Sequence, residues 1–173
     1  VIMPTVKGMA ADGIPYTGFL YAGLMIAPDG KIKTLEFNCR MGDPETQPIM
    51  ARLRSDLVNA LDHAIDGKLN EIELDWDRRT ALGVVLAAHN YPETPRNGDV
   101  ITGIPDDTES QITFHAGTKL QDGKVITSGG RVLCVVGLAD TVRGAQQKAY
   151  DAIEKIRFDG MQYRKDIGYR AIK

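Results

Sequence analysis

The sequence predicts an α+β protein in which an antiparallel hairpin and helices precede a small β-rich region that carries its own helix near the C-terminal end. The hairpin is indicated by an apolar segment, residues 18–26, and a segment that alternates polar with apolar residues, 31–40, on either side of Ala27-Pro28-Asp29-Gly30. Proline second and glycine fourth are typical of a type I turn. Helices are indicated where apolar residues recur every three or four positions, over 55–65 and 141–157.

The first half of the chain is expected to be helical on the C-terminal side of the hairpin and irregular before it. Residues 3–17 are rich in Gly, Pro and Ala, which predicts a connector. Residues 46–53 predict a short helix, and the helix over 55–65 follows it. For the second helix we expect Ser55 as the N-cap and Gly67 as the C-terminal stop.

The second half alternates short apolar segments with turn signals, which is typical of β structure. The expected strands are residues 80–88, 100–104, 111–115, 124–127 and 131–138. A helix then closes the pattern, with Asp140 or Thr141 as its cap and one buried face made of Val142, Ala145, Ala149, Ala152, Ile153 and Ile156. The tail, residues 163–169, is expected to be ordered against this body. The polar segment before residue 80 predicts a boundary between two domains, residues 1–72 and 73–173.

Composition excludes several classes of protein. The 173 residues are 43% hydrophobic and 25% charged, with a net charge of −2, so no basic footprint indicates nucleic acid or a membrane surface. No apolar run approaches the roughly 18 residues that span a bilayer. Cys39 and Cys134 lie far apart in apolar segments, which predicts buried reduced thiols and a cytoplasmic protein. Because the chain starts at Val1 in mid-pattern, we expect it to be a piece of a longer one.

Three polar residues recur at every second position of the second hairpin strand. Glu36, Asn38 and Arg40 therefore share one face, and the opposite face, expected to point into a core, carries Leu35, Phe37 and Cys39. A carboxylate and an amide oxygen suit a hard cation, and a guanidinium suits phosphate. Spacing alone leaves open whether this row is a metal–phosphate site or a solvated strand face.

Five segments together resemble one family of proteins. They are PYTGFLYAGLM (15–25), LEFNCRMGDPE (35–45), FHAGTK (114–119), GGRVL (129–133) and YRKDIG (163–168). In this order they resemble the C-terminal half of the phosphoribosylamine–glycine ligase (glycinamide ribonucleotide synthetase) family, which belongs to the ATP-grasp superfamily. Separate motifs along the whole length make the resemblance much more specific than a single short pattern.

The resemblance implies a fold and a reaction. Residues up to about Lys68 would be the end of an ATP-grasp domain, and the remainder a small β-rich C-terminal domain. The implied enzyme is an ATP-dependent carbon–nitrogen ligase of de novo purine (IMP) biosynthesis. It joins glycine to 5-phosphoribosylamine through a glycyl phosphate and converts ATP to ADP and phosphate. Its N-terminal part is missing here, so we expect this chain alone to be inactive.

The resemblance also implies roles for the polar row and the residues after it. Glu36 and Asn38 would hold Mg²⁺ or Mn²⁺ between the ATP phosphates, and Arg40 would face the acyl phosphate. Asp43, taken with Arg40 as catalytic, and Glu45, taken as substrate-binding, would orient the glycine amine or support Arg40. Capping of the following helix is the competing interpretation for both acids.

A second group of residues is a weaker candidate for substrate binding. His115, Thr118, Lys119 and Arg131 would bind the ribose phosphate of phosphoribosylamine. Gly129 and Gly130 would let backbone amides approach a phosphate, although a hairpin turn explains them equally well. His63 and His89 are expected to be surface or structural residues.

Two alternatives come from other classes of protein. One is another ATP-grasp carboxylate–amine ligase or a carboxylase subunit, since such enzymes share the Glu-x-Asn-x-Arg row. The other is a non-catalytic module derived from the fold. Residues 42–45 and 114–118 favour the phosphoribosylamine–glycine ligase family over other ATP-grasp enzymes. The intact polar row argues against a module that has lost its chemistry.

Overall fold

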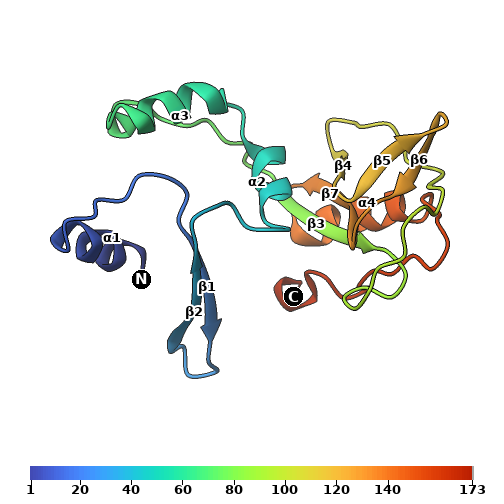
Figure 1. Cartoon of the computed structure of the whole chain (residues 1–173), viewed down its shortest axis with the longest axis horizontal. Helices are drawn as coiled ribbons and strands as arrows, with labels where there is room; N and C mark the ends of the chain where they lie inside the picture. Colours follow the sequence, from blue (N-terminus) through green and yellow to red (C-terminus); the bar gives the residue numbers. More distant parts are fainter. Residues whose placement is uncertain (173) are drawn as a thin grey trace. The chain divides into compact units, whose positions relative to one another are not determined.

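The computed structural model describes residues 1–172, which form two compact units (Figure 1). The first unit consists of Val1–Thr46 and Arg54–Asp75, and the second of Gln47–Leu53 and the chain from Trp76 onward. The chain thus passes between the units after Thr46, after Leu53 and after Asp75. The sequence-based boundary between residues 72 and 73 stays a prediction.

The first unit begins with a helix that the sequence analysis did not expect. Helix α1 (Ile2–Ala11) occupies most of the segment predicted to be an irregular connector, so that prediction is wrong there. A proline in the first turn costs a helix no hydrogen bond, and the surrounding Met and Ala residues favour helix. Gly13, with a φ of +79°, follows the last turn, as glycine commonly does.

The predicted hairpin is confirmed. Strand β1 (Tyr21–Ile26) pairs antiparallel with β2 (Ile32–Asn38), with a register shift between Gly23 and Leu24. The amide of Gly30 donates to Ala27 O over 2.9 Å, which closes the expected turn. Leu35, Phe37 and Cys39 are all exposed, so the expectation that they face a core is wrong for the described residues. A two-stranded hairpin has no layer of its own to cover either face.

Helix α3 (Leu57–Ile65) completes the first unit together with a short 3-10 turn, Leu69–Glu71. Its N-cap is Asp56, whose Oδ1 accepts from Val58 N over 2.8 Å, and not Ser55 as predicted. The Ser55 hydroxyl instead accepts from the amide of Asp75 over 2.6 Å. Aspartate and serine are equally good caps, so local preference does not choose between neighbours. Gly67 is confirmed as the stop, with a φ of +72°.

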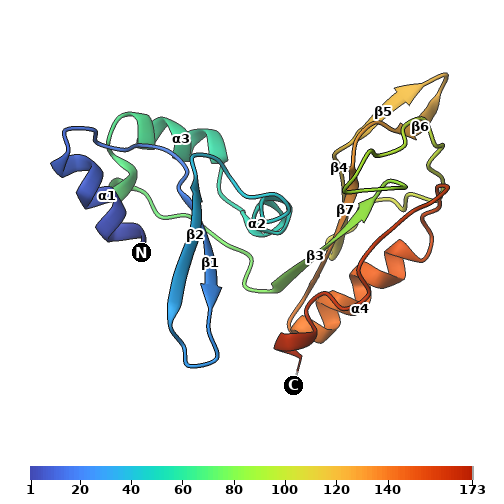
Figure 2. The ribbon, with the colours of Figure 1, turned by 60° about the horizontal axis from the view of Figure 1, so that its bottom comes forward.

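The second unit is built on an antiparallel sheet of order β3-β7-β4 (Figure 2). Its strands are β3 (Thr80–Ala87), β4 (Gln111–His115) and β7 (Arg131–Ala139). A separate hairpin pairs β5 (Thr118–Gln121), which was not predicted, with β6 (Lys124–Thr127). The segment predicted as a strand over 100–104 makes only isolated bridges, because it contains a glycine with positive φ, Gly103.

Helices pack against both faces of the central sheet. Helix α4 (Val142–Ile153) buries Ala145, Ala149, Ala152 and Ile153 against one face, as its spacing predicted. Thr141 is its N-cap, and Oγ1 accepts from Gly144 N over 3.1 Å. A Cβ on Gly137 would lie 2.1 Å from Ala145 O, so glycine permits this close approach. The other face, with Cys134, Val136 and Leu138, receives Ala51 of helix α2 (Thr46–Arg52).

The C-terminal segment is ordered against the second unit, as expected. The Tyr150 hydroxyl donates to Arg164 O over 2.8 Å and accepts from Ile167 N over 3.2 Å. Arg164 also pairs with Asp166 over 2.7 Å. Within residues 1–172, every helix is too short or too polar to cross a bilayer.

Candidate active site

The polar row on β2 brings Glu36 and Asn38 into direct contact. The Asn38 side-chain amide donates to Glu36 Oε1 over 3.0 Å. Across the hairpin, Gly23 pairs with Glu36, and a Cβ on Gly23 would lie 3.1 Å from Glu36 Cγ. Glycine at this position therefore leaves room for the carboxylate. The alternation that predicted a shared face is confirmed for these two residues.

Arg40 lies beyond the end of β2, which stops at Asn38. Its NH1 donates to the carbonyl of the next residue, Met41, over 2.9 Å. Arg40 is therefore held by the loop rather than by the strand, so strict alternation is not the reason for its position. It nevertheless acts on the same neighbourhood: the negative charge of Glu45 raises the pKa of Tyr21, and the positive charge of Arg40 partly opposes that rise.

Tyr21 joins the row and was missed by the sequence analysis. Its hydroxyl donates to Glu45 Oε1 over 3.3 Å. The negative charge of Glu45 is the main cause that raises the pKa of Tyr21, with smaller contributions from burial, the hydrogen bond and Glu36. In the hairpin register Tyr21 faces Asn38. Only a prediction of that cross-strand register would have identified it.

The loop after β2 folds back onto Tyr21 because residue 42 is a glycine. Gly42 is buried, and a Cβ there would lie 2.4 Å from Glu45 Oε2 and 2.9 Å from Tyr21 Cε2. Both the amide and the hydroxyl of Thr46 donate to Gly42 O, which ties the start of α2 to this loop. Glu45 thus contacts the tyrosine, while the role of Asp43 stays a prediction.

The two strand residues fit a hard divalent cation. Among residues 1–172, no group of three or more His, Cys, Asp or Glu side chains is arranged to hold a metal. Glu36 and Asn38 would supply two oxygen ligands if the Asn38 amide rotated to present Oδ1 instead of its nitrogen. Such a pair suits Mg²⁺, which is commonly held by one or two side chains together with phosphate oxygens and waters.

The weaker group of predicted residues belongs to the second unit. His115 Nδ1 lies 3.0 Å from Thr118 Oγ1, which links the end of β4 to the start of β5. The Arg131 guanidinium lies 6.0 Å from the centre of the Tyr91 ring, within reach of a cation–π contact. The structure therefore links His115 with Thr118, whereas Lys119 and Arg131 keep their predicted roles only as expectations.

The glycines near Arg131 have a packing explanation. Residues 128–130 do not form a hairpin turn, since β6 pairs with β5 and β7 pairs with β3 and β4. A Cβ on Gly117 would lie 2.8 Å from Gly129 Cα, and a Cβ on Gly130 would lie 2.4 Å from the Tyr91 ring. The hairpin interpretation is therefore wrong: the close backbone of Gly117 accounts for Gly129, and the Tyr91 ring accounts for Gly130.

Two other predictions concern histidine and cysteine. His63 Nδ1 lies 2.8 Å from Asn59 O within α3, which agrees with a structural role. Cys134 is buried as expected, whereas Cys39 is exposed, and no disulfide joins the two in the described residues. Cys39 lies past the last residue of β2, where the hairpin has no covering layer.

Comparisons with known proteins agree along the whole chain. Two family descriptions match: "Phosphoribosylglycinamide synthetase, ATP-grasp (A) domain" over residues 1–46 and "Phosphoribosylglycinamide synthetase, C domain" over residues 81–170. The chain is 74% identical to a phosphoribosylamine–glycine ligase of Ralstonia nicotianae over 173 residues and 61% identical to one of Neisseria meningitidis. These alignments cover 100% and 99% of this chain, but 41% of each relative.

A solved structure gives the same correspondence. The crystal structure of a phosphoribosylamine–glycine ligase from Thermotoga maritima superposes with a TM-score of 0.79 at 41% sequence identity. It covers 93% of this chain and 39% of that protein. The chain therefore spans about two fifths of the length of the relatives that it matches.

Proposed function

The chain belongs to the phosphoribosylglycinamide synthetase family, and we propose that it forms the C-terminal part of a phosphoribosylamine–glycine ligase. The enzyme would join glycine to 5-phosphoribosylamine and convert ATP to ADP and phosphate. The observation that carries the proposal is the contact of Glu36 with Asn38 inside the segment that matches the ATP-grasp domain. The match to the C domain follows it along the chain, and the alignment with a phosphoribosylamine–glycine ligase covers all of this chain.

Glu36 and Asn38 would hold Mg²⁺ or Mn²⁺ against the phosphates of ATP. When bound, such an ion neutralises charge on the transferring phosphoryl group. Arg40 would add a fixed positive charge for the acyl phosphate of glycine. Its guanidinium and the Glu45 carboxylate both act on Tyr21, which supports a shared electrostatic environment.

The remaining assignments extend this proposal to the substrates. Asp43 and Glu45 would orient the glycine amine, and Tyr21 would keep the Glu45 carboxylate in place through its hydroxyl. His115, Thr118 and Arg131 would bind the phosphate of phosphoribosylamine. The rest of the same enzyme would supply the other walls of the ATP site. A cytoplasmic location is proposed from the biosynthetic role of the family.

The test replaces Glu36 by glutamine in the full-length ligase. Glu36→Gln keeps the shape of the side chain but removes its charge, so we expect kcat/KM to fall on the order of 100-fold. ADP release with glycine and phosphoribosylamine measures it, and the concentration of Mg²⁺ at half-maximal rate should rise. The matched control is Glu73→Gln, which changes another exposed glutamate of the first unit.

A solvated strand face would give a different result. In that case Glu36→Gln would behave like Glu73→Gln, with unchanged kcat/KM and unchanged Mg²⁺ dependence, and the proposal would fail. Thermal unfolding of both variants checks that the fold is intact. The 173-residue chain alone should release no ADP, and turnover by it would contradict our assignment of the missing walls.

A further inference from the structure

The exposed Arg131 at the start of β7 lies over an aromatic ring of its own unit. Its guanidinium carbon is 6.0 Å from the centre of the Tyr91 ring. A cation at this distance is attracted by the negative face of the ring. Such a contact engages the flat face of a guanidinium, whereas an anion is bound by the N–H groups at its edge. One arginine can therefore rest on a ring and bind an anion at the same time.

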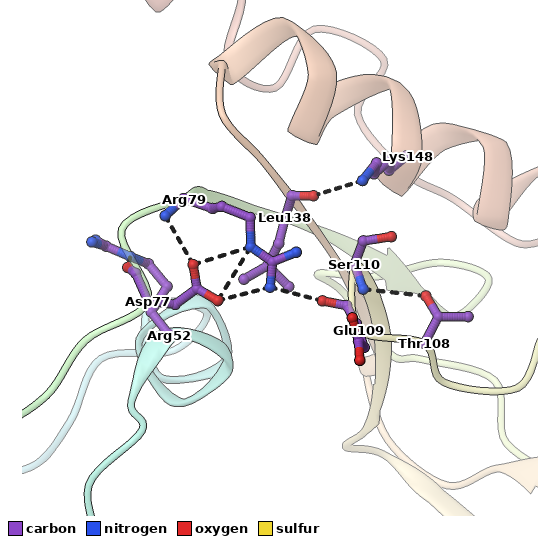
Figure 3. Close-up of polar contacts among 8 residues, drawn as sticks. All are labelled: Arg52, Asp77, Arg79, Thr108, Glu109, Ser110, Leu138 and Lys148. Atoms are coloured by element: carbon purple, nitrogen blue, oxygen red, sulfur yellow. Dashed lines mark hydrogen bonds and ion pairs between the residues drawn. The ribbon is translucent and has the colours of Figure 1, made fainter.

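Arg79 of the same unit is held in a different way. Asp77 is only 6% exposed, and its carboxylate accepts from Nε and Nη2 of Arg79 (Figure 3). Arg79 Nη2 also donates to Glu109 O over 2.9 Å, and the hydrogen bond to Asp77 is the main cause that raises the pKa of the Arg79 guanidinium. These contacts engage the edge of the guanidinium, which suits a structural ion pair, whereas a ring supports Arg131 from its flat face.

The loop that carries Tyr91 is fixed to the backbone that leads into β7. Ala88 is 0% exposed, and its amide donates to Gly130 O over 2.9 Å. The amide of Tyr91 in turn donates to Ala88 O over 3.2 Å. A Cβ on Gly130 would lie 2.4 Å from Tyr91 Cδ2, so the ring packs directly on this glycine. The residue immediately before Arg131 therefore determines where the ring lies.

The backbone of Arg131 also lies next to the contact between His115 and Thr118. Gly117, which stands between these two residues in the sequence, donates its amide to Arg131 O over 2.8 Å. A Cβ on Gly117 would lie 2.8 Å from the same oxygen, so glycine permits the close approach. His115 and Arg131 are both exposed. The pairing thus brings Arg131 beside the two residues that are proposed to bind the same phosphate.

We propose that Tyr91 is a positioning residue for the phosphate of 5-phosphoribosylamine, whose ring holds the Arg131 guanidinium in place for that phosphate. This inference rests on the proposed function. An arginine side chain has several rotatable bonds, so a support that restricts it before binding reduces the entropy lost on binding. A cation–π contact at an exposed site corresponds to a change of about two- to fivefold in an equilibrium constant.

The experiment measures kcat and the KM for each substrate in variants of the full-length ligase. Tyr91→Leu removes the ring, so we expect the KM for phosphoribosylamine to rise about fourfold, with kcat and the KM values for ATP and glycine unchanged. Tyr91→Phe keeps the ring and should keep the KM of the wild type. The matched control is Tyr169→Leu, because Tyr169 makes the same kind of contact with Arg170, over 5.6 Å. It should leave all three KM values unchanged.

A double-mutant cycle shows whether Tyr91 acts through Arg131. Arg131→Gln removes the charge and should raise the KM for phosphoribosylamine about 20-fold. Adding Tyr91→Leu to Arg131→Gln should then raise this KM no further, because the ring has no cation left to hold. Should Tyr91→Leu fail to fold, Tyr91→pentafluorophenylalanine takes its place in the cycle. It keeps a ring of similar shape but removes the negative face, so the KM for phosphoribosylamine should rise in the same way.

The outcomes separate the role of Tyr91 from the function of the enzyme. An unchanged KM for phosphoribosylamine in Tyr91→Leu, an equal rise in Tyr169→Leu, or a further rise in the double variant would overturn the positioning role. A wild-type enzyme that releases no ADP from these substrates would instead contradict the proposed function. In that case calorimetric titration with ribose 5-phosphate decides about Tyr91: we expect weaker binding in Tyr91→Leu than in the wild type, and equal affinity or no binding to the wild type refutes the role.

Discussion

The hairpin of the first unit and the sheet of the second differ completely in burial: strand β2 alternates apolar with polar residues, whereas β3 and β7 are almost continuously apolar. Leu35 on β2 is 64% exposed, whereas Leu133 on β7 is 0% exposed. The sheet is covered by α4 on one face and receives α2 on the other, and the hairpin has no such layer among the described residues of its unit. Alternation therefore predicts a strand, but a second element has to supply the burial.

Polar residues in the two regions also differ in how far they are buried. Glu36 and Asn38 lie on an open strand, where water or a ligand can reach them. Asp77 is buried, and its charge is compensated by Arg79. Exposed polar side chains that converge suit binding, whereas a buried ion pair suits a structural role.

The largest expected difference between the regions is the cost of removing a leucine. Leu133→Ala should lower the free energy of unfolding of the second unit by about 2–5 kcal/mol, because it leaves a cavity in a closed core. Leu35→Ala should cost less than about 0.5 kcal/mol, since its side chain is mainly in water. Guanidinium unfolding followed by far-UV circular dichroism and by the single tryptophan, Trp76, measures both. Equal costs would show that the hairpin has a core of its own.

A smaller difference is expected for the two helix caps. Thr141→Ala and Asp56→Ala each remove a side-chain acceptor worth about 1 kcal/mol. The loss at Thr141 should lower the unfolding free energy of the whole second unit, because α4 covers its core. The loss at Asp56 should only speed hydrogen exchange within residues 57–65. Thr141→Ser and Asp56→Asn keep the acceptor and serve as controls; if they matched the alanine variants, capping would not be the cause.

The smallest expected effect concerns two tyrosines with raised pKa values. For Tyr150 the main cause is burial, and for Tyr21 it is the charge of Glu45. Salt screens the second cause but not the first, so raising the ionic strength should lower the pKa of Tyr21 toward 10.0 and change that of Tyr150 less. Glu45→Gln should lower only the pKa of Tyr21. Titration of ¹³C-labelled tyrosine by NMR measures both values.

The raised pKa of Tyr150 also predicts how the stability of the second unit depends on pH. A tyrosine whose folded pKa lies above its unfolded pKa contributes stability that is present below pH 10.0 and is lost as the pH rises through the folded value. Tyr150→Phe should therefore weaken the alkaline loss of stability of the second unit. An unchanged alkaline transition would assign that loss to other groups.

Local signals predicted much of this fold. Turn residues correctly predicted the position of the hairpin, and Gly67 correctly predicted the end of α3. Helical spacing predicted α3, α4 and the buried face of α4. The same signals failed at α1, where Gly and Pro suggested a loop, and at Ser55, where a neighbouring aspartate is an equally good cap. They also suggested a hairpin turn at residues 128–130, because local sequence does not say which strand pairs with which.

By itself, the sequence determined the types of ligand at Glu36 and Asn38 and their spacing along one strand, because strand geometry is set locally by the backbone. Only the tertiary structure decided that Tyr21 meets Glu45, that α2 packs with the second unit, and that Asp77 is buried with Arg79. These contacts join residues that are distant in the sequence, except for the last pair. Even there, burial depends on how helices and sheet pack, which no local pattern records.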